Sequence, residues 1–396
     1  MKNIYWRPRK ISRTALVWLT VAAIGAMTVL ELAPDQQVAG QREAKLEASR
    51  LAAVGMDLIK AERLRRGHDI VAEFDPGETG MIGQSMSLVT SVPGHLGAKQ
   101  TSVNPNFAAV VVEMLQDSGV AEGDLVAVGC SGSFPALNVC VFAALETLGA
   151  RPVVISSAAA SQFGANIPDL MWVDMERELF ESGLVSFRSV AASYGGYEDR
   201  GLGMSDQSIE LITAALDRNE LSKLESDSLD EAISKRMNIY ERESHGGKYK
   251  AYINVGGGAS SVGRTEGKHL YDPGMNETPD AEALAIDSVM TRFAEQGIPL
   301  VHLVQIKQLA DQYGLPQSPE LRPEPGTGGI FVRQTYDRPL AVIFLCGLSF
   351  VLCGLVLTGF RRPFVRLAEM LHLHRQAQGP RLTVMAAETQ GGELMV

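Results

Sequence analysis

Three short segments rich in glycine and serine each follow an apolar run of the kind that forms a β-strand. They are Gly129-Cys130-Ser131-Gly132-Ser133, Ser156-Ser157 with Ser161, and Gly256-Gly257-Gly258 with Ser260 and Ser261. Because open parallel sheets bind ligands at the carboxyl ends of their strands, we expect these segments to meet at one polar pocket. Glycines there let the backbone approach a ligand closely. The residues expected to bind the ligand are Gly129, Gly132, Ser157, Gly256, Gly257, Gly258, Ser260 and Arg264.

The first segment differs by one residue from the nucleophile elbow Gly-x-Ser-x-Gly. In that motif a sharp turn exposes a serine hydroxyl, and the next N–H helps to form an oxyanion hole. Ser131 is therefore the predicted nucleophile. Ser133 stands where the last glycine would be, and it also fits a helix N-cap, with Pro135 in the first helical turn. The sequence predicts that Ser133 either caps the helix or supplies a second hydroxyl.

A serine nucleophile needs a base and a group that orients the base. In hydrolase order an acid and a histidine follow the serine, and the candidates are Asp174 or Asp272 with His245, His269 or His302. His302 lies inside an apolar run and is interpreted as a core histidine. Lys99 is an alternative base for a serine–lysine pair if burial removes its water. The catalytic candidates are Ser131, Ser133, His269 and Lys99.

The same segments also fit a non-covalent anion site. Helix N-termini at Ser133 and after Gly258, with Arg264 and Lys268 nearby, are suited to a carboxylate or a phosphate. The triple-glycine segment lacks the Lys-Ser/Thr pair of a phosphate-binding loop and does not match Gly-x-Gly-x-x-Gly, which argues against a nucleotide. No histidine or cysteine cluster has metal-ligand spacing, so we expect neither a metal nor a cofactor.

Apolar strands alternate with helices over the middle of the chain. Strands are predicted at residues 124–129, 151–157, 251–256 and 298–304. Helices are predicted from residue 104, over residues 133–149, and at 207–216, 229–241 and 281–296. This alternation, with strands that are apolar throughout, is typical of an α/β fold with a mostly parallel sheet and helices on both faces.

Two apolar runs are candidates to cross a membrane. Residues 14–32 approach the ~20 residues that a spanning helix needs, and residues 339–360 carry no charge. Basic residues precede the first run and follow the second, so we expect two transmembrane helices with both termini in the cytoplasm. A cleaved signal peptide is the alternative for the first run, but the residues after it lack a convincing cleavage site.

These runs set the expected domain boundaries. They are a cytoplasmic N-terminus at 1–13, transmembrane helices at 14–32 and 339–360, a stalk helix at 33–67, an extracytoplasmic α/β domain at 68–314, a Pro-rich linker at 315–338 and a cytoplasmic tail at 361–396. Residues 34–338 contain 26 basic and 42 acidic residues, which disfavours nucleic acid as a partner and requires any anion to bind at a local site. Cys130 and Cys140 are not expected to form a disulfide, because the predicted strand and helix hold them too far apart.

Four segments are characteristic of a known family. They are FDPGETGMIG, TSVNPNFAAVVVEMLQDSGVAEGDLVAVGCSGSFPALN, VVISSAAASQFGANIPDLMWVDME and INVGGGASSVG. The chain resembles the bacterial poly-gamma-glutamate system protein family over the whole outer domain and both apolar runs. Ser131, Gly132, Ser133 and Pro135 match the GxSGSFPAL pattern of that family, and Cys130 stands at a variable position in it.

The resemblance implies a pathway rather than a reaction. The implied protein lies in the bacterial plasma membrane and accompanies the synthase that makes and exports poly-γ-glutamate. The implied partners are the membrane subunits of the synthase, poly-γ-glutamate or its chain end, and the lipid bilayer.

Two functions stay open at this point. One is hydrolysis or transfer at an acyl or γ-glutamyl bond, with Ser131 as nucleophile and oxyanion N–H groups at Gly132 and in the Gly256–Gly258 segment. The other is a non-catalytic accessory subunit that stabilises the synthase and binds the end of the polymer in the same pocket.

Overall fold

The computed structural model describes residues 13–32, 34–35, 39–267, 269–331, 335–336 and 338–358. The chain divides into two compact units. The larger unit is Gln37–Arg333, and the smaller unit combines Met1–Gln36 with Gln334–Val396. The expected cytoplasmic tail and nearly all of the expected N-terminal segment lie outside the described residues.

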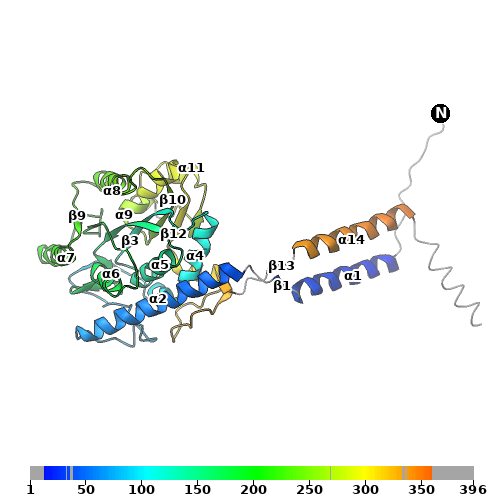
Figure 1. The fold of residues 1–396 in the computed structure, drawn as a ribbon, viewed down its shortest axis with the longest axis horizontal. Helices are drawn as coiled ribbons and strands as arrows, with labels where there is room; N and C mark the ends of the chain where they lie inside the picture. Colours follow the sequence, from blue (N-terminus) through cyan, green and yellow to red (C-terminus); the bar gives the residue numbers. More distant parts are fainter. Residues whose placement is uncertain are drawn as a thin grey trace, which may run out of the picture. The chain divides into compact units, whose positions relative to one another are not determined.

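A seven-stranded sheet forms the centre of the larger unit (Figure 1). Its strands are, in spatial order, β11 (Gly274–Asn276), β12 (Leu300–Leu303), β10 (Tyr249–Val255), β3 (Leu125–Ser131), β4 (Arg151–Ser157), β8 (Ala191–Ser193) and β9 (Ser222–Leu224). Neighbouring strands run parallel except for β11, which pairs with β12 in the antiparallel direction. The predicted mostly parallel sheet is therefore confirmed.

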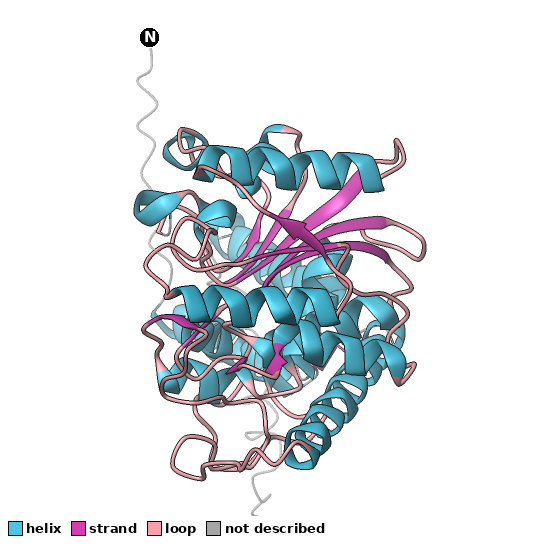
Figure 2. Ribbon diagram, turned by 90° about the vertical axis from the view of Figure 1, so that its left-hand side faces the viewer, coloured by secondary structure: helices cyan, strands magenta, loops and turns pink. Residues whose placement is uncertain are grey.

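Helices lie on both faces of this sheet (Figure 2). Val126 and Val128 of β3 join an apolar cluster on one face, whereas Leu125 and Ala127 join a second cluster on the other face. The first face is covered by α2 (Ala39–Arg65), α4 (Phe107–Asp117) and α5 (Pro135–Thr147), and the second by α8 (Leu229–Glu243) and α12 (Val289–Glu295). Because both faces are buried, the central strands are apolar at nearly every position.

The four predicted strands are present as β3, β4, β10 and β12. Strands β8, β9 and β11 were not predicted, because three residues are too few to establish a strand pattern. The predicted helices at 207–216 and 229–241 are confirmed as α7 (Asp206–Arg218) and α8. The single helix predicted at 281–296 is wrong. Ser288 divides it into α11 (Ala281–Leu284) and α12, because its hydroxyl accepts the Thr291 N–H at 3.0 Å and caps a new helix.

The predicted N-cap role of Ser133 is also wrong. Helix α5 begins at Pro135, its N-cap residue is Phe134, and no side chain caps it. The Ser133 Oγ atom instead accepts the Ser161 N–H at 3.0 Å. This bond joins the loop after β3 to the short strand β5 (Ala160–Ser161).

Helix α2 belongs to the core and is not the expected stalk (Figure 1). Ala48, Ala52, Met56 and Ile59 are fully buried on the face that packs against α4, α5 and α6 (Trp172–Glu181). Lys45 Nζ on this helix also donates to Glu113 Oε2 of α4 at 2.5 Å. The sequence pattern hid this face because alanines, which let helices approach closely, form much of it.

The expected Pro-rich linker packs on the larger unit as far as it is described. Leu315 and Ile330 are buried in the core. Arg322 Nη1 pairs with Asp57 Oδ1 of α2 at 2.6 Å, and the Asn106 Nδ2 group donates to the Glu324 carbonyl at 2.9 Å. Residues 315–331 are therefore part of the domain and not a free connection.

The smaller unit contains α1 (Arg13–Leu32) and α14 (Arg338–Thr358), which contact each other. Strand β1 (Pro34–Asp35) pairs in the antiparallel direction with β13 (Thr335–Tyr336). Within the described part of the chain, α1 is the one helix long and apolar enough to cross a membrane, since the apolar stretch of α14 is shorter. The last two residues of the second expected span lie outside the described residues.

The core position of α2 leads to a stability prediction. Met56→Ala removes a fully buried side chain and should lower the free energy of unfolding by about 2–5 kcal/mol, measured by urea denaturation of the detergent-solubilised chain. The matched control is Val54→Ala on the same helix, where the side chain is 54% exposed and the change should stay below about 0.5 kcal/mol. Equal effects of the two substitutions would contradict the core assignment.

Candidate functional site

The strand order of the sheet reverses direction between β3 and β10. From β3 the chain adds β4, β8 and β9 on one side, and then returns to place β10 and β12 on the other side. A crevice opens at the carboxyl ends of the two strands at such a reversal, and ligands of open α/β sheets bind there. The segments after β3 and after β10, which the sequence singled out, border this crevice.

Gly256 and Ser131 pack against each other where β10 and β3 end. Gly256 has φ of +86°, and a Cβ atom at this position would lie 3.4 Å from Ser131 Cβ. The N–H groups of Gly257 and Gly258 donate to no group within the described residues, and both glycines are exposed. In contrast, the Gly132 N–H donates to the Ser157 carbonyl at 3.0 Å, so this predicted oxyanion donor is engaged in the fold.

The Ser131 hydroxyl has a turn-forming role. Its Oγ atom accepts the Ser133 N–H at 3.2 Å, and the Asn138 Nδ2 group donates to the Ser131 carbonyl at 2.9 Å. Across the described part of the chain, no histidine or lysine forms a hydrogen bond with Ser131 Oγ. The structure thus places Ser131 at the crevice but brings no base to it.

Lys99 lies beside a different serine. It belongs to α3 (Leu96–Ser102), is 3% exposed, and its Nζ atom bonds to Ser161 Oγ at 3.0 Å and to the Ser133 carbonyl. The ammonium also lies over the Phe134 ring, 3.5 Å from the centroid. Burial lowers the pKa of Lys99 to about 7, because the charged form loses its hydration. A lysine in this state exchanges its proton near neutral pH and is suited to general base catalysis.

Sequence reasoning grouped Ser161 with the second serine-rich segment but did not pair it with Lys99. Ser161 is 6% exposed and lies on β5, which pairs in parallel with β2 (Thr90–Val92). The two segments of chain that carry Lys99 and Ser161 are brought together by this pairing and by the loop after β3. The sequence indicated Lys99 as the base of a serine–lysine pair, but it did not indicate which serine lies beside it.

Ser157 is committed to a buried polar cluster at the carboxyl ends of β4 and β8. Arg236 Nη2 donates to Ser157 Oγ at 3.1 Å and to Asp199 Oδ2 at 2.7 Å. Ser193 Oγ donates to Asp199 Oδ1 at 2.6 Å. Arg236 and Asp199 are each 4% exposed on their side chains, and Asp199 has φ of +64°. This ion pair fixes the loop after β8 and leaves Ser157 little capacity for a ligand.

The remaining predicted ligand and base residues lie apart from the Lys99–Ser161 pair. Ser260 is buried in α9 (Ala259–Val262), and Arg264 is exposed at the start of α10 (Arg264–Gly267). His269 is exposed in the segment between α10 and β11, and Lys268 lies outside the described residues. None of these side chains bonds to Ser131, Ser133 or Ser161 in the described structure.

His302 is a buried histidine, as the sequence analysis expected. Asn254 Nδ2 contacts its Nδ1 atom at 3.0 Å and also donates to the Gly256 carbonyl at 2.6 Å. Burial lowers the pKa of His302 to about 4, so the ring is neutral at physiological pH. His302 therefore helps to position the Gly256 segment, because Asn254 bonds to both. His245 lies in the exposed turn after α8, near the amino end of β10.

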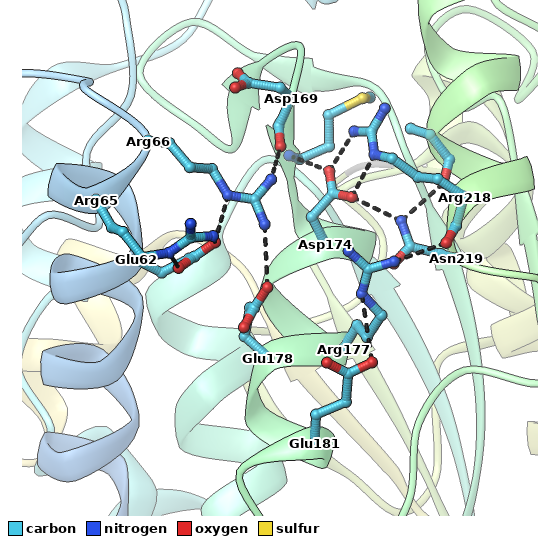
Figure 3. Close-up of polar contacts among 12 residues, drawn as sticks. Glu62, Arg65, Arg66, Asp169, Asp174, Arg177, Glu178, Glu181, Arg218 and Asn219 are labelled. Atoms are coloured by element: carbon cyan, nitrogen blue, oxygen red, sulfur yellow. Dashed lines mark hydrogen bonds and ion pairs between the residues drawn. The ribbon is translucent and has the colours of Figure 1, made fainter.

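Asp174 serves the packing of α6 and not a catalytic site. Its carboxylate accepts bonds from Arg218 Nε at 2.6 Å and Asn219 Nδ2 at 2.7 Å, and Figure 3 shows it at the centre of this network. Beside it Arg66, the residue after α2, bonds to Glu178 of α6 at 3.0 Å. Asp174 is fully buried, so these partners neutralise a carboxylate that would otherwise be costly to bury.

Neither the cysteines nor a metal cluster adds chemistry to the crevice in the described residues. Cys130 and Cys140 are both free and buried, which agrees with the expectation that they form no disulfide. No group of three histidine, cysteine or acidic residues is arranged to hold a metal ion within the residues that are described.

A cavity of about 550 Å³ lies at the opposite, amino end of β10, lined by Tyr240, Tyr249 and Phe293 among others.

Comparison with known proteins assigns no relative to this chain. No family model matches it, and neither a curated protein nor a solved structure matches it.

The crevice wall gives a prediction with an internal control. Gly256→Ala places a side chain at a φ of +86°, which L residues rarely adopt, so it should destabilise the protein by roughly 1–2 kcal/mol in thermal or urea unfolding. Gly257→Ala, one residue later, meets nothing within 4 Å and should leave stability nearly unchanged. If Gly256→Ala were as well tolerated as Gly257→Ala, the left-handed backbone at Gly256 would not be a constraint of the fold.

Proposed function

We propose that this protein is a membrane component of a poly-γ-glutamate production and export system, and that its larger unit hydrolyses or transfers a γ-glutamyl or other acyl bond. The pathway is supported by the sequence segments around GCSGSFPALN that resemble the family. The reaction is supported by one observation, the buried contact between Lys99 Nζ and Ser161 Oγ at 3.0 Å. The proposed location is the bacterial plasma membrane, with the larger unit outside the cytoplasm.

Lys99 is the base of the proposed reaction. With a pKa of about 7, a large share of the molecules carry a neutral amine at neutral pH. The neutral amine keeps an N–H for the Ser133 carbonyl and directs its lone pair to the Ser161 hydroxyl. Ser161, rather than Ser131, is therefore the nucleophile we propose.

The proposed steps follow those of other serine–lysine pairs. Ser161 Oγ attacks the acyl carbon while its proton moves to Lys99 Nζ, and the carbonyl electron pair moves onto the oxygen. When the C–O double bond re-forms, the C–N bond breaks and Lys99 returns the proton to the departing amine. Water then attacks the acyl-serine ester with Lys99 as base, which releases a carboxylic acid and regenerates Ser161. An amine in place of water gives transfer.

The negative charge of the larger unit does not prevent the Lys99–Ser161 pair from acting on an anionic polymer, because the pair needs to contact only one amide bond at a time. Residues 34–338 contain 26 basic and 42 acidic residues, so an extended groove would repel poly-γ-glutamate. A local pocket needs to neutralise only one or two carboxylates, and the exposed N–H groups of Gly257 and Gly258 are donors for such a group.

The proposal includes two membrane helices. Along the contact between α1 and α14, Ala26 and Leu355 are each 8% exposed, whereas Trp18 and Phe350 on the outside are 70% and 81% exposed. Large apolar side chains on the outside of a helix pair require a lipid or protein environment. This pattern and the flanking basic residues support two spans with both termini in the cytoplasm.

A second candidate function is favoured by the burial of the pair. Lys99 and Ser161 are only 3% and 6% exposed, so the described conformation offers them to no large substrate. A non-catalytic accessory subunit that stabilises the synthase and binds the chain end would need no reactive serine.

The two functions differ in their response to substitution. We expect Ser161→Ala and Lys99→Met each to lower the rate of γ-glutamyl or other acyl bond cleavage or transfer by about a hundredfold or more, and to change the amount or length of secreted polymer. Ser131→Ala should have a smaller effect, because its hydroxyl accepts the Ser133 N–H and bonds to no base among the described residues. The rate should rise with pH through about 7, since only the neutral form of Lys99 accepts a proton.

Membrane abundance must be matched between these strains, and circular dichroism of the purified variants checks that they fold. Normal polymer from folded Ser161→Ala and Lys99→Met would exclude the serine–lysine mechanism and favour the accessory subunit. A rate that does not change between pH values below and above 7 would also exclude Lys99 as the base.

The topology gives a separate prediction. Reporter fusions at the N-terminus and at the C-terminus should both be active in the cytoplasm, and a fusion inserted in the larger unit should be active only outside it. Leu348→Arg, a charge in the middle of α14, should lower the membrane abundance of the full chain. A cytoplasmic larger unit would overturn the proposed location.

A further inference from the structure

Phe134 stands between the Lys99–Ser161 pair and the crevice at the strand reversal. One face of its ring lies over Lys99 Nζ, 3.5 Å from the ring centroid. Its Cδ2 atom lies 3.7 Å from the point where a Cβ atom on Gly256 would stand. The ring therefore lies next to both the amine and the Gly256 segment.

The Phe134 side chain covers the buried pair. Lys99 and Ser161 are 3% and 6% exposed, while Phe134 itself is partly exposed. One aromatic ring thus separates the ammonium from solvent on this side. Next to Gly256, which the ring approaches, the chain is open to solvent, since Gly257 is exposed.

The backbone of Phe134 is held firmly, so the side chain is the part able to move. Its N–H donates to the Ser131 carbonyl at 3.3 Å, and its carbonyl accepts the Asn138 N–H at 3.0 Å. Pro135 follows it and fixes the start of α5. Rotation about the side-chain torsions moves the ring without breaking these bonds.

We propose that Phe134 is the gate to the Lys99–Ser161 pair, and that a substrate reaches the pair when the ring turns aside. The size of the opening then makes Phe134 a residue that determines which acyl groups reach Ser161. This role in specificity rests on the proposed function, whereas the gate itself is a property of access to Lys99.

The test measures access without requiring activity. The full chain in detergent is treated at mildly alkaline pH with a bulky amine reagent, a biotin succinimidyl ester, and separately with formaldehyde and a reducing agent. Mass spectrometry gives the modification rate of Lys99 relative to the exposed Lys248. We expect Phe134→Ala to raise the rate of the bulky reagent at Lys99 about tenfold, with a smaller rise for formaldehyde.

Phe163→Ala is the matched control. It removes a ring from the neighbouring loop that packs on Phe74, with a centroid distance of 5.1 Å, and should leave Lys99 labelling unchanged. Phe134→Leu keeps apolar volume in the core and decides the question if Phe134→Ala does not fold. Labelling of Lys99 at the wild-type rate in a folded Phe134 variant would overturn the gate.

The gate and the proposed function fail separately. Faster Lys99 labelling in Phe134→Ala, together with full activity of Ser161→Ala, would uphold the gate and exclude the serine mechanism. Unchanged labelling in Phe134→Ala, together with loss of activity in Ser161→Ala, would uphold the mechanism and exclude the gate.

Discussion

The carboxyl end of β3 is packed so closely that side chains have no room at two of its positions. A Cβ atom on Gly129 would lie 2.6 Å from Tyr252 Oη, and one on Gly132 would lie 2.8 Å from the Ala158 carbonyl oxygen. Because both positions are glycines, β10 and the segment after β4 are able to pack closely against this end of β3. The loop after β3 therefore packs against β5. The bond from the Ser161 N–H to Ser133 Oγ, and with it the position of the Ser161 hydroxyl, depends on this close approach.

The same packing explains why a lysine is buried there. Lys99 has three polar or aromatic neighbours, the Ser161 hydroxyl, the Ser133 carbonyl and the Phe134 ring, and among the described residues no carboxylate forms an ion pair with it. Desolvation is therefore not offset by an opposite charge, and it lowers the pKa of the amine to about 7. The buried ion pair of Arg236 with Asp199 shows the contrast, since there a carboxylate compensates the burial and the pKa of Arg236 is raised.

The proposed function joins this reactive pair to a membrane anchor and a polymer pathway. The pair is enclosed, the unit around it is acidic, and the donors at the crevice are backbone N–H groups. A site of this kind is suited to binding one amide bond near a chain end rather than an extended length of the polymer. The gate at Phe134 would keep water from Lys99 until a substrate occupies the crevice.

The sequence by itself determined the elements with a regular local pattern. The apolar strands β3, β4, β10 and β12, the helices α7 and α8, and the glycine-serine segments at the strand ends follow from side-chain alternation and from turn chemistry, which act over a few residues. The tertiary structure alone decided which distant groups meet. Ser161 and Lys99 are 62 residues apart, and their contact depends on strand order and loop packing, which no local pattern encodes. The burial of α2 was hidden for a related reason, because an alanine face becomes a core face only when another helix lies against it.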